Sequence, residues 1–402
     1  MTSKETIMEG SHAIAYAVKA CQPHVVSAYP ITPQTHIVER ISDLVADGEM
    51  KTKGKDGKER PCRYVRVESE FSAASVVAGA SATGARTYSA TTSQGLILMS
   101  EVLFNIAGMR LPVVITCANR GLSAPITIWN DHQDSVSQRD NGWIQMYGEH
   151  IQEIVDMHIQ AFKIAEELKI PAMICLDGFI LTHVYEPVEL PDEEKVRKFL
   201  PDYKPEFYLD PQKPRTFGAF AAPNKYMETR YILDRDLQNA KKRIDEVANE
   251  FKNEFGRYFG GLIEEYRTED AEIMLLAMGS VVGTMKDAID NMREQGKKVG
   301  LIKLRVYRPF PKESLVKAMS KAKVVGILDK NISLGNEGAV FTEVKSALYD
   351  QKSRPKALNF IVGLGQRDIT TKTIENIVAN CEKALTEEVD PIQWMDLIEE
   401  LI

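Results

Sequence analysis

The chain has 402 residues, 44% of them hydrophobic and 27% charged, and a formal net charge of −7. This composition predicts a globular protein of two or three domains, and it gives no support for nucleic-acid binding, which favours basic surfaces. The longest apolar runs, such as 95–99, are too short to span a bilayer, and residues 1–10 lack the apolar core of a signal peptide. We therefore expect a cytoplasmic protein that binds no membrane.

The cysteines are widely scattered, and no two lie in a CxxC pair. There are five, at Cys21, Cys62, Cys117, Cys175 and Cys381. An iron–sulfur cluster needs about four converging thiolates, usually at short spacings. We therefore expect no cluster and no metal site on this chain, and we expect the cysteines to be small buried side chains.

Strand-like and helix-like segments alternate from the start of the chain. We expect strands at 24–28, 64–67, 86–91, 112–118 and 171–176. We expect helices at 7–21, 34–44, 71–83, 96–107 and 151–168. This alternation predicts a parallel, doubly wound sheet with helices on both faces.

Residues 51–60, with the sequence KTKGKDGKER, interrupt this alternation. The segment is rich in lysine and has no apolar face. We expect a solvated loop or the end of a hairpin there, and the alternative is a docking loop for an acidic protein such as ferredoxin.

A proline-rich segment separates the first α/β unit from a second one. Residues 187–226 contain seven prolines, at positions 187, 191, 201, 205, 211, 214 and 223, which predicts an extended linker without regular structure. A polar helix is expected at 227–267. Strands are then expected at 273–277, 299–304, 324–328 and 358–362.

The expected fold class is thus α/β, with two doubly wound parallel-sheet domains joined by the linker and the long helix. The predicted boundaries are 1–186 for the first domain, 187–268 for the linker and connecting helix, and 269–402 for the second domain.

Four polar or glycine-marked junctions follow strands of the first unit. They lie at 28–33, 67–70, 91–95 and 118–120. Ligands of open α/β sheets bind outside the carboxyl ends of the strands. We therefore expect these junctions to supply a carboxylate, a guanidinium and several hydroxyls to one crevice.

The same junctions carry a resemblance to a known family. The stretches AYPITPQT at 28–35, VESEFS at 67–72, SQGL at 93–96, ANRGLS at 118–123 and WNDHQD at 129–134 resemble motifs of the 2-oxoacid:ferredoxin oxidoreductases. Residues 6–185 resemble the family's pyrimidine-binding domain, best as it occurs in the α subunits of pyruvate:ferredoxin oxidoreductases. Residues 270–385 resemble its second domain, which is similar to the C-terminal domain of transketolases.

The resemblance implies thiamine diphosphate as cofactor, with Glu70 as the catalytic glutamate that hydrogen-bonds N1′ of the aminopyrimidine. A carboxylate suits this role because it can share a proton with a ring nitrogen. The alternative role for Glu70 is a carboxylate that interacts with the N-terminal dipole of a helix. Glu68, two residues earlier, is expected to point to the opposite side.

The resemblance also implies that Arg120 and Thr32 bind the substrate. A guanidinium can bind a carboxylate through two parallel hydrogen bonds. The alternative role of Arg120 is a structural ion pair with Asp131 or Asp134. Prolines on both sides restrict the backbone around Thr32. Its neutral side chain favours a small monocarboxylate such as pyruvate over a dicarboxylate.

Further residues around the thiamine pocket follow from the same resemblance. The expected cofactor-binding residues besides Glu70 are Tyr29, Pro30, Ile31, Ser93, Gln94 and Gly95. Asn119, Trp129, Asn130, Asp131 and His132 are expected to line the same crevice, with a loop hydrogen bond as the alternative role for His132.

One expected motif is absent from this sequence. Thiamine enzymes usually hold the diphosphate and Mg²⁺ with Gly-Asp-Gly followed by a distant Asn, and none of the Asp-Gly pairs here is preceded by Gly. The resemblance therefore implies that the cofactor is shared with a β subunit that carries Mg²⁺, and that [4Fe–4S] clusters lie on ferredoxin-like γ and δ subunits.

The implied activity is the oxidative decarboxylation of pyruvate with coenzyme A to acetyl-CoA and carbon dioxide, with reduction of ferredoxin. The alternatives are a related enzyme for a branched or aryl 2-oxoacid, a non-catalytic assembly scaffold, and a transketolase-like synthase.

Overall fold

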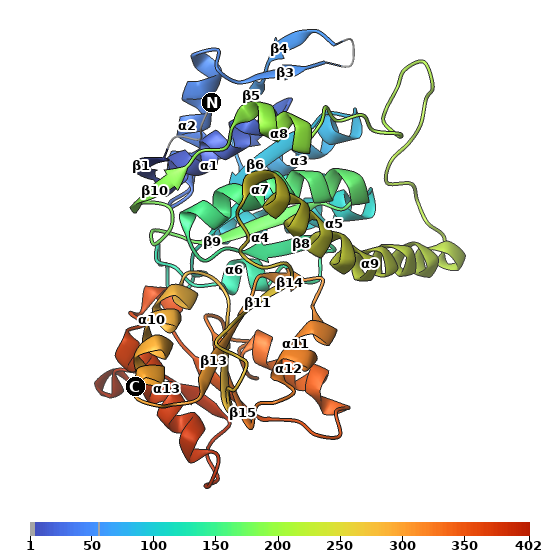
Figure 1. The fold of residues 1–402 in the computed structure, drawn as a ribbon. Helices are drawn as coiled ribbons and strands as arrows, with labels where there is room; N and C mark the ends of the chain where they lie inside the picture. Colours follow the sequence, from blue (N-terminus) through green and yellow to red (C-terminus); the bar gives the residue numbers. More distant parts are fainter. Residues whose placement is uncertain (1–4, 55–56) are drawn as a thin grey trace.

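Two sheets, one in each half of the chain, organise the computed structural model, which describes residues 5–54 and 57–402 (Figure 1). The first sheet has the strand order β14 (Val306–Arg308), β8 (Ile144–Tyr147), β9 (Ala172–Asp177), β7 (Val114–Asn119), β6 (Thr87–Thr91), β2 (Val25–Ala28) and β5 (Arg63–Arg66). Neighbouring strands are parallel except for β14, which pairs antiparallel with β8. The predicted parallel sheet is therefore confirmed, with one antiparallel edge.

Helices cover both faces of this sheet. One face packs on α1 (Gly10–Ala20), α2 (Thr35–Ala46) and α7 (Ile151–Leu168). The other packs on α3 (Glu70–Ala82), α4 (Ser93–Leu98) and α5 (Ser100–Gly108). Strand β7 shows the reason, because Val114 and Ala118 belong to the first core and Ile115 and Cys117 to the second.

The second sheet has six strands rather than the four predicted. Their order is β11 (Ile263–Tyr266), β13 (Val299–Leu304), β12 (Ile273–Ala277), β15 (Val324–Asp329), β16 (Lys356–Ile361) and β17 (Ile392–Trp394). Only β11 runs antiparallel to its neighbour among these described strands. Helices α10 (Val281–Glu294) and α13 (Thr371–Lys383) cover one face, and α11 (Lys312–Met319) and α12 (Ala339–Tyr349) cover the other.

The two halves share the second of these cores, which contains Cys117 of β7 and Leu276 of β12. Strand β14 belongs to the second half of the sequence but adds an edge to the first sheet. Tyr307 on β14 packs edge-on against Tyr147 on β8, with ring centroids 6.3 Å apart. The sequence did not predict β14, because three residues are too few for a hydrophobic period. The boundaries at 186 and 268 stay predictions.

The connecting segment differs from its prediction at several points. Strand β10 (Tyr185–Glu189) pairs with β1 (Glu5–Glu9), and α8 (Glu193–Phe199) is capped by Asp192, so part of the proline-rich stretch is regular. Helix α9 runs over Pro223–Phe255, not over 227–267. It ends at Gly256, whose φ of +79° is left-handed, and the chain then forms β11.

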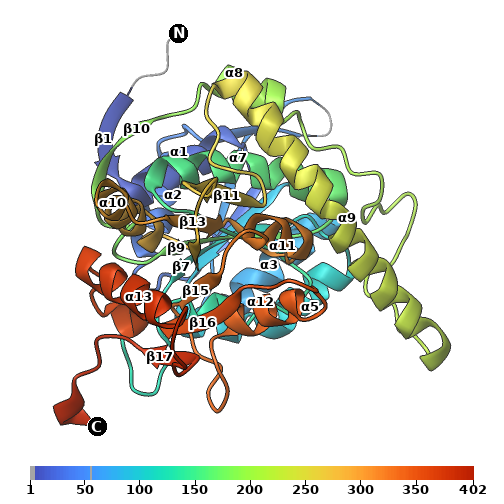
Figure 2. The ribbon, with the colours of Figure 1, turned by 60° about the horizontal axis from the view of Figure 1, so that its bottom comes forward.

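Helix α9 is only partly packed. Its buried side chains, which recur at helical spacing, are Leu233, Ala240, Ile244, Val247, Ala248 and Phe251. All of them lie beyond the first ten residues of the helix, and Figures 1 and 2 show the N-terminal end of α9 extending away from the body. The rest of the helix packs near α7 and α8.

Other predictions needed smaller changes. The first predicted helix starts at Gly10 rather than at residue 7, because the preceding residues pair with β10. The helix predicted at 96–107 is two helices, α4 and α5, that meet at Met99. The lysine-rich segment forms a hairpin of β3 (Lys51–Lys53) and β4 (Glu59–Pro61), although residues 55–56 lie outside the described residues, as do residues 1–4.

All five cysteines are buried with free thiols, so their predicted burial is confirmed. Among the described residues, no helix combines the length and the apolar character that crossing a membrane would require.

Candidate active site

The four predicted junctions meet at one edge of the first sheet. Strands β7, β6, β2 and β5 are consecutive neighbours in that sheet, and all are parallel. Their carboxyl ends therefore lie side by side, and each is followed directly by one of the junctions. The predicted convergence is confirmed.

Glu70 is the first residue of α3, at the end of the β5 junction. Ser69 caps the helix by accepting a hydrogen bond from the Ser72 amide at 3.3 Å. The Glu70 side chain is only 7% exposed, and no described residue hydrogen-bonds its carboxylate. Helix capping is thus performed by Ser69, which leaves the Glu70 carboxylate available to a ligand.

Gly95 on α4 lies directly against this carboxylate. A Cβ atom at position 95 would lie 2.7 Å from Glu70 Oε1 and 2.7 Å from Thr91 Oγ1, closer than real contacts allow. Only glycine fits there while Glu70 keeps its place. Glu68 is exposed and accepts a hydrogen bond from the Ser72 hydroxyl, so it is separately engaged.

Two buried polar atoms near these residues lack protein partners. Thr91 Oγ1 and Asn119 Oδ1 are inaccessible to solvent and have no hydrogen-bond partner among the described residues. Buried polar atoms are normally paired, and exceptions concentrate at functional sites. The ends of β6 and β7 therefore hold two polar atoms whose hydrogen-bonding capacity the surrounding described residues do not use.

Arg120 is buried at the end of β7 and is not part of an ion pair. Its Nε donates to the carbonyl of Thr127 at 2.7 Å, and its Nη1 donates to the carbonyl of Thr32 at 2.8 Å. Within the described part of the chain, no acid pairs with the guanidinium and no partner takes Nη2. The alternative ion pair with Asp131 or Asp134 is therefore wrong. Burial lowers the pKa of Arg120 from its ordinary value.

Gln34, a residue that the sequence analysis did not single out, holds the 29–34 loop in place through two hydrogen bonds. Gln34 is fully buried; its Nε2 donates to the Ala90 carbonyl at 2.7 Å and its Oε1 accepts from the Ile31 amide at 3.3 Å. The Thr32 side chain is exposed beside Arg120. Tyr29 and Pro30 are also exposed in this loop, and Ile31 is partly exposed. The structure thus brings Thr32 and Arg120 together.

Asp134 is a second residue that the sequence analysis missed as part of the site. It is fully buried and accepts hydrogen bonds from the amides of Ser93 and Arg120 at 2.9 and 3.0 Å and from the Asn119 side chain at 2.7 Å. Burial raises the pKa of Asp134, although these hydrogen bonds act in the opposite direction. One carboxyl group therefore joins the β6 and β7 junctions.

Ser93 adds a further hydrogen bond between the β6 and β7 junctions. Its hydroxyl donates to the Gly121 carbonyl at 2.6 Å, and its φ of +46° is in the left-handed region. A non-glycine residue in this region carries backbone strain, which is common at functional sites. The Ser93 hydroxyl also lies 2.6 Å from Oε1 of the neighbouring Gln94, which is partly exposed.

Asn130, Asp131 and His132 lie between the end of the first sheet and the second half of the chain. Asn130 Nδ2 donates to the Asn119 carbonyl at 3.2 Å, and the His132 amide donates to the Lys330 carbonyl at 2.8 Å. Their expected place in the thiamine pocket stays a prediction. His132 Nε2 contacts Asp177 Oδ1 at 2.6 Å, and Asn130 Nδ2 donates to the same oxygen at 3.0 Å. Asp131 Oδ2 accepts from the Gly365 amide at 3.2 Å. The hydrogen bond expected as the alternative role of His132 is present. Trp129 is 47% exposed.

Asp177 is the centre of this contact between the two halves. Besides His132 and Asn130, it accepts from the Ser280 amide at 2.8 Å and pairs with Lys330 Nζ at 3.1 Å. Burial alone would raise the pKa of Asp177, but the nearby charges of Lys330 and His132 outweigh it and hold the pKa well below its usual range. The loop between β7 and α6 (Gln133–Val136) is thereby fixed to the second domain.

The fold and these junctions define an α/β protein with two large sheets and a buried, unpaired carboxylate at the carboxyl ends of parallel strands. Residues 16–249 match the family described as pyruvate flavodoxin/ferredoxin oxidoreductase, thiamine diphosphate-binding, and residues 271–374 match the pyruvate:ferredoxin oxidoreductase core domain II. The chain belongs to the pyruvate:ferredoxin oxidoreductase family, whose members are oxidoreductases.

Relatives align over almost the whole chain. Pyruvate synthase subunit PorA of Methanosarcina barkeri is 53% identical, over 99% of this chain and 98% of the relative. Ketoisovalerate oxidoreductase subunit VorA of Pyrococcus abyssi is 44% identical, over 94% of each chain. The solved 2-oxoglutarate:ferredoxin oxidoreductase of Magnetococcus marinus has the same fold, with a TM-score of 0.67, 18% identity and coverage of 94% of this chain and 65% of that longer one.

Proposed function

We propose that this chain is the α subunit of a pyruvate:ferredoxin oxidoreductase, which converts pyruvate and coenzyme A to acetyl-CoA and carbon dioxide and reduces ferredoxin. The observation that carries the proposal is the unpaired Glu70 carboxylate against Gly95, within a domain of a thiamine diphosphate-binding family. A scaffold subunit would have no use for a buried carboxylate without a partner, since leaving a carboxylate buried and unpaired is costly.

The crevice fits the pyrimidine ring of thiamine. The Glu70 carboxylate is an acceptor without a protein partner, and Gly95 beside it has no side chain that would block a flat, nitrogen-rich ring. When bound, thiamine diphosphate supplies the carbon nucleophile and the electron sink for decarboxylation. Glu70 holds a proton at N1′ of the pyrimidine and so sets the protonation state of that ring.

Arg120 positions the substrate in this proposal. Its Nε and Nη1 are fixed by the carbonyls of Thr127 and Thr32, and Nη2 remains to donate to the carboxylate of a 2-oxoacid. The 29–34 loop contains no basic residue, so it supplies no cation besides Arg120 for a second substrate carboxylate. This favours a monocarboxylate such as pyruvate over 2-oxoglutarate.

Partner subunits complete the enzyme in this proposal. The sequence has no Gly-Asp-Gly motif for the diphosphate and Mg²⁺, so a β subunit supplies them and thiamine diphosphate lies between the two chains. Ferredoxin-like γ and δ subunits carry the [4Fe–4S] clusters. The name of the PorA relative, a subunit, supports an assembly of this kind.

A branched 2-oxoacid is the second candidate substrate, because the VorA relative is 44% identical. The test is purification of the complex from its native host, identification of the co-eluting chains, and measurement of kcat/KM for pyruvate, 2-ketoisovalerate and 2-oxoglutarate. We expect the highest value for pyruvate. A higher kcat/KM for 2-ketoisovalerate would make 2-ketoisovalerate, and not pyruvate, the substrate. A complex without thiamine-dependent turnover would support the scaffold alternative.

A further inference from the structure

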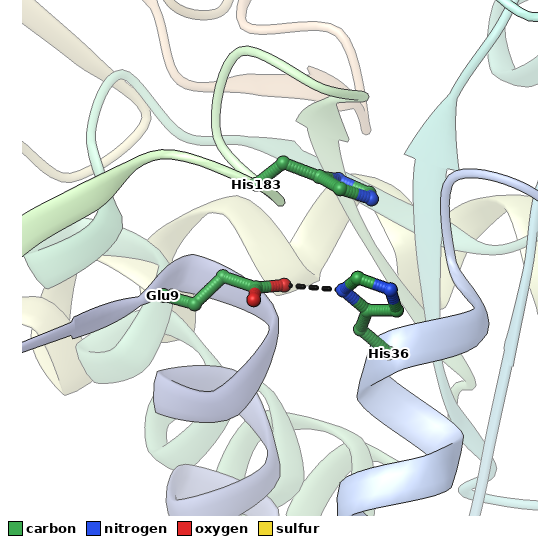
Figure 3. A group of neighbouring side chains, drawn as sticks. All are labelled: Glu9, His36 and His183. Atoms are coloured by element: carbon green, nitrogen blue, oxygen red, sulfur yellow. Dashed lines mark hydrogen bonds and ion pairs between the residues drawn. The ribbon is translucent and has the colours of Figure 1, made fainter.

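Glu9, His36 and His183 form a cluster of metal-binding side chains that the proposed function does not use (Figure 3). Glu9 ends β1, His36 lies in the first turn of α2, and His183 lies in the loop between β9 and β10. One ligand atom from each of the three lies within 4.8 Å of the others. Three segments that are far apart in the sequence thus present their donors to one point.

Backbone hydrogen bonds fix two of the three positions. The Gly10 amide donates to the Val184 carbonyl at 3.1 Å, and the Ser11 amide donates to the Thr182 carbonyl at 2.9 Å. A Cβ atom on Gly10 would lie 1.9 Å from the Leu181 carbonyl oxygen, so only glycine allows this approach. The backbones of Glu9 and His183 are therefore held beside each other before any ligand binds.

Each of the two imidazole rings has one nitrogen within hydrogen-bond distance of an oxygen. His36 Nδ1 is 2.7 Å from Glu9 Oε1, so the two atoms share a proton in a hydrogen bond. A metal ion bound by both atoms would take the place of that proton. His183 Nδ1 is 2.7 Å from Thr182 Oγ1, which leaves Nε2 of His183 as its free ring nitrogen. A histidine ligand commonly bonds an oxygen through its second ring nitrogen, which fixes the ring orientation.

The three side chains differ in how far solvent reaches them. The Glu9 side chain is 9% exposed, whereas the His36 side chain is 43% exposed. The rings of His36 and His183 lie beside each other, with their centroids 4.6 Å apart. The cluster therefore lies at the protein surface, with the carboxylate on its buried side.

We propose that Glu9, His36 and His183 bind one Zn²⁺ ion. Two imidazoles and one carboxylate are a ligand set that Zn²⁺ accepts, with a solvent molecule as the fourth ligand. Ligand atoms of a tetrahedral zinc site lie about 3.3 Å apart. The ligand atoms here lie within 4.8 Å of one another, so the widest separation must shrink by at most about 1.5 Å. The His36 side chain is 43% exposed and free to make this movement, and its exposure gives the fourth ligand access.

The bound ion would tie together the start of α2 and the loop after β9. Helix α2 follows the 29–34 loop, which carries Thr32. Phe179 in the other loop packs at a tilt against His183, with ring centroids 4.8 Å apart, and against Trp129 at 4.9 Å. Zinc would therefore stabilise two segments that lead to the crevice, without contacting Glu70 or Arg120.

The test uses the complete chain after treatment with a chelator, titrated with Zn²⁺ by calorimetry. We expect one ion per chain with a Kd of about 1 µM or tighter. His36→Gln and His183→Gln should each weaken binding at least about tenfold. His12→Gln, a change in α1 outside the cluster, is the matched control and should bind as the wild type does. Equal binding by all the variants would overturn the proposal.

A second measurement does not depend on whether the variants fold. Co²⁺ added to the chelator-treated wild-type chain should give the visible absorption bands of a tetrahedral site, and Zn²⁺ should remove them. Saturating Zn²⁺ should also raise the Tm of the wild type. A chain that shows no Co²⁺ bands and no Zn²⁺-dependent change in Tm would contain no such site.

Discussion

A single carboxylate, that of Glu70, determines what this crevice can do. Its neighbours are arranged so that none of the described residues neutralises it: Ser69 caps the helix, Gly95 has no side chain, and Glu68 binds Ser72 instead. The surroundings therefore keep one acceptor free at the carboxyl ends of four parallel strands. This is the arrangement that a proton-sharing role at a ring nitrogen requires.

Glu70→Gln is expected to lower the turnover of the assembled complex by a factor of about a thousand or more, because an amide cannot share a proton as a carboxylate does. The fold should be unaffected, since the two side chains have nearly the same size. Glu68→Gln is the matched control, because Glu68 is exposed and binds only Ser72 in the described structure; it should retain turnover within a few-fold. Normal turnover of the Glu70 variant would remove this residue from the site.

Gly95→Ala tests the close contact between position 95 and the Glu70 carboxylate, while the carboxylate itself is retained. The added Cβ would lie 2.7 Å from Glu70 Oε1, so the carboxylate must move. We expect a large loss of turnover while Glu70 is still present. Gly79→Ala on α3 is the control, because no atom lies within 4 Å of its added Cβ. If both variants were equally active, the position of Glu70 would not matter.

Arg120→Lys is expected to raise the KM for pyruvate without loss of cofactor. Lysine keeps the charge but not the planar fork, and it cannot hold the carbonyls of Thr127 and Thr32 while it donates to a substrate. Steady-state kinetics and the thiamine content of the purified complex separate the two effects. An unchanged KM would mean that Arg120 only joins the two loops.

At the scale of elements, the sequence predicted the first sheet well. Buried parallel strands are continuous apolar runs, and the polar junctions after them mark their carboxyl ends. The sequence analysis did not predict β8, β11, β14 or β17. Strands of three or four residues, such as β14 and the half-polar IEEY segment of β11, carry no clear period. Asp134 and Gln34 were missed for another reason: a buried polar side chain has the same sequence signature as an exposed one.

The loop between β7 and α6 shows the same limit. Its motif at 129–134 was expected in the crevice, and the structure adds a second role, because Asn130, Asp131 and His132 also join the two halves of the chain through Asp177 and Gly365. A motif shows that residues are used together, but it does not show which face of a loop each side chain occupies. That information lies in tertiary packing.

Asp177→Asn tests this junction. The amide keeps the shape but leaves Lys330, whose side chain is 4% exposed, without its buried counter-charge. Breaking a buried ion pair by removing one partner costs about 3–5 kcal/mol. We expect a lower unfolding midpoint in urea and faster hydrogen exchange at 129–134 and 279–283. Asp47→Asn, at an exposed position after α2, should leave both unchanged. Unchanged exchange in the Asp177 variant would argue against its central role.

At the scale of the whole molecule, the buried titratable groups decide how the stability changes with pH. His158 lies in the centre of α7, fully buried, with Nε2 2.7 Å from Thr116 Oγ1 and Nδ1 2.7 Å from the Ile154 carbonyl oxygen. Burial lowers the pKa of His158 to about 4, although the contact with the Ile154 carbonyl acts against it. The ordinary pKa in an unfolded chain is about 6.5. The folded protein therefore binds this proton less readily than the unfolded chain does.

The free energy of unfolding should consequently fall as the pH is lowered from about 6.5 to about 4, because the unfolded chain takes up the proton first. The full contribution of His158 is about 3 kcal/mol, present above pH 6.5 and lost as the pH falls through 4. His158→Gln keeps a polar side chain but cannot titrate. We expect this variant to lose less stability over the same range, with a slope smaller by at most about 1.4 kcal/mol per pH unit. Urea unfolding of both proteins at several pH values between 4 and 7.5 measures the difference. Parallel curves would show that another group, such as His183, causes the acid sensitivity.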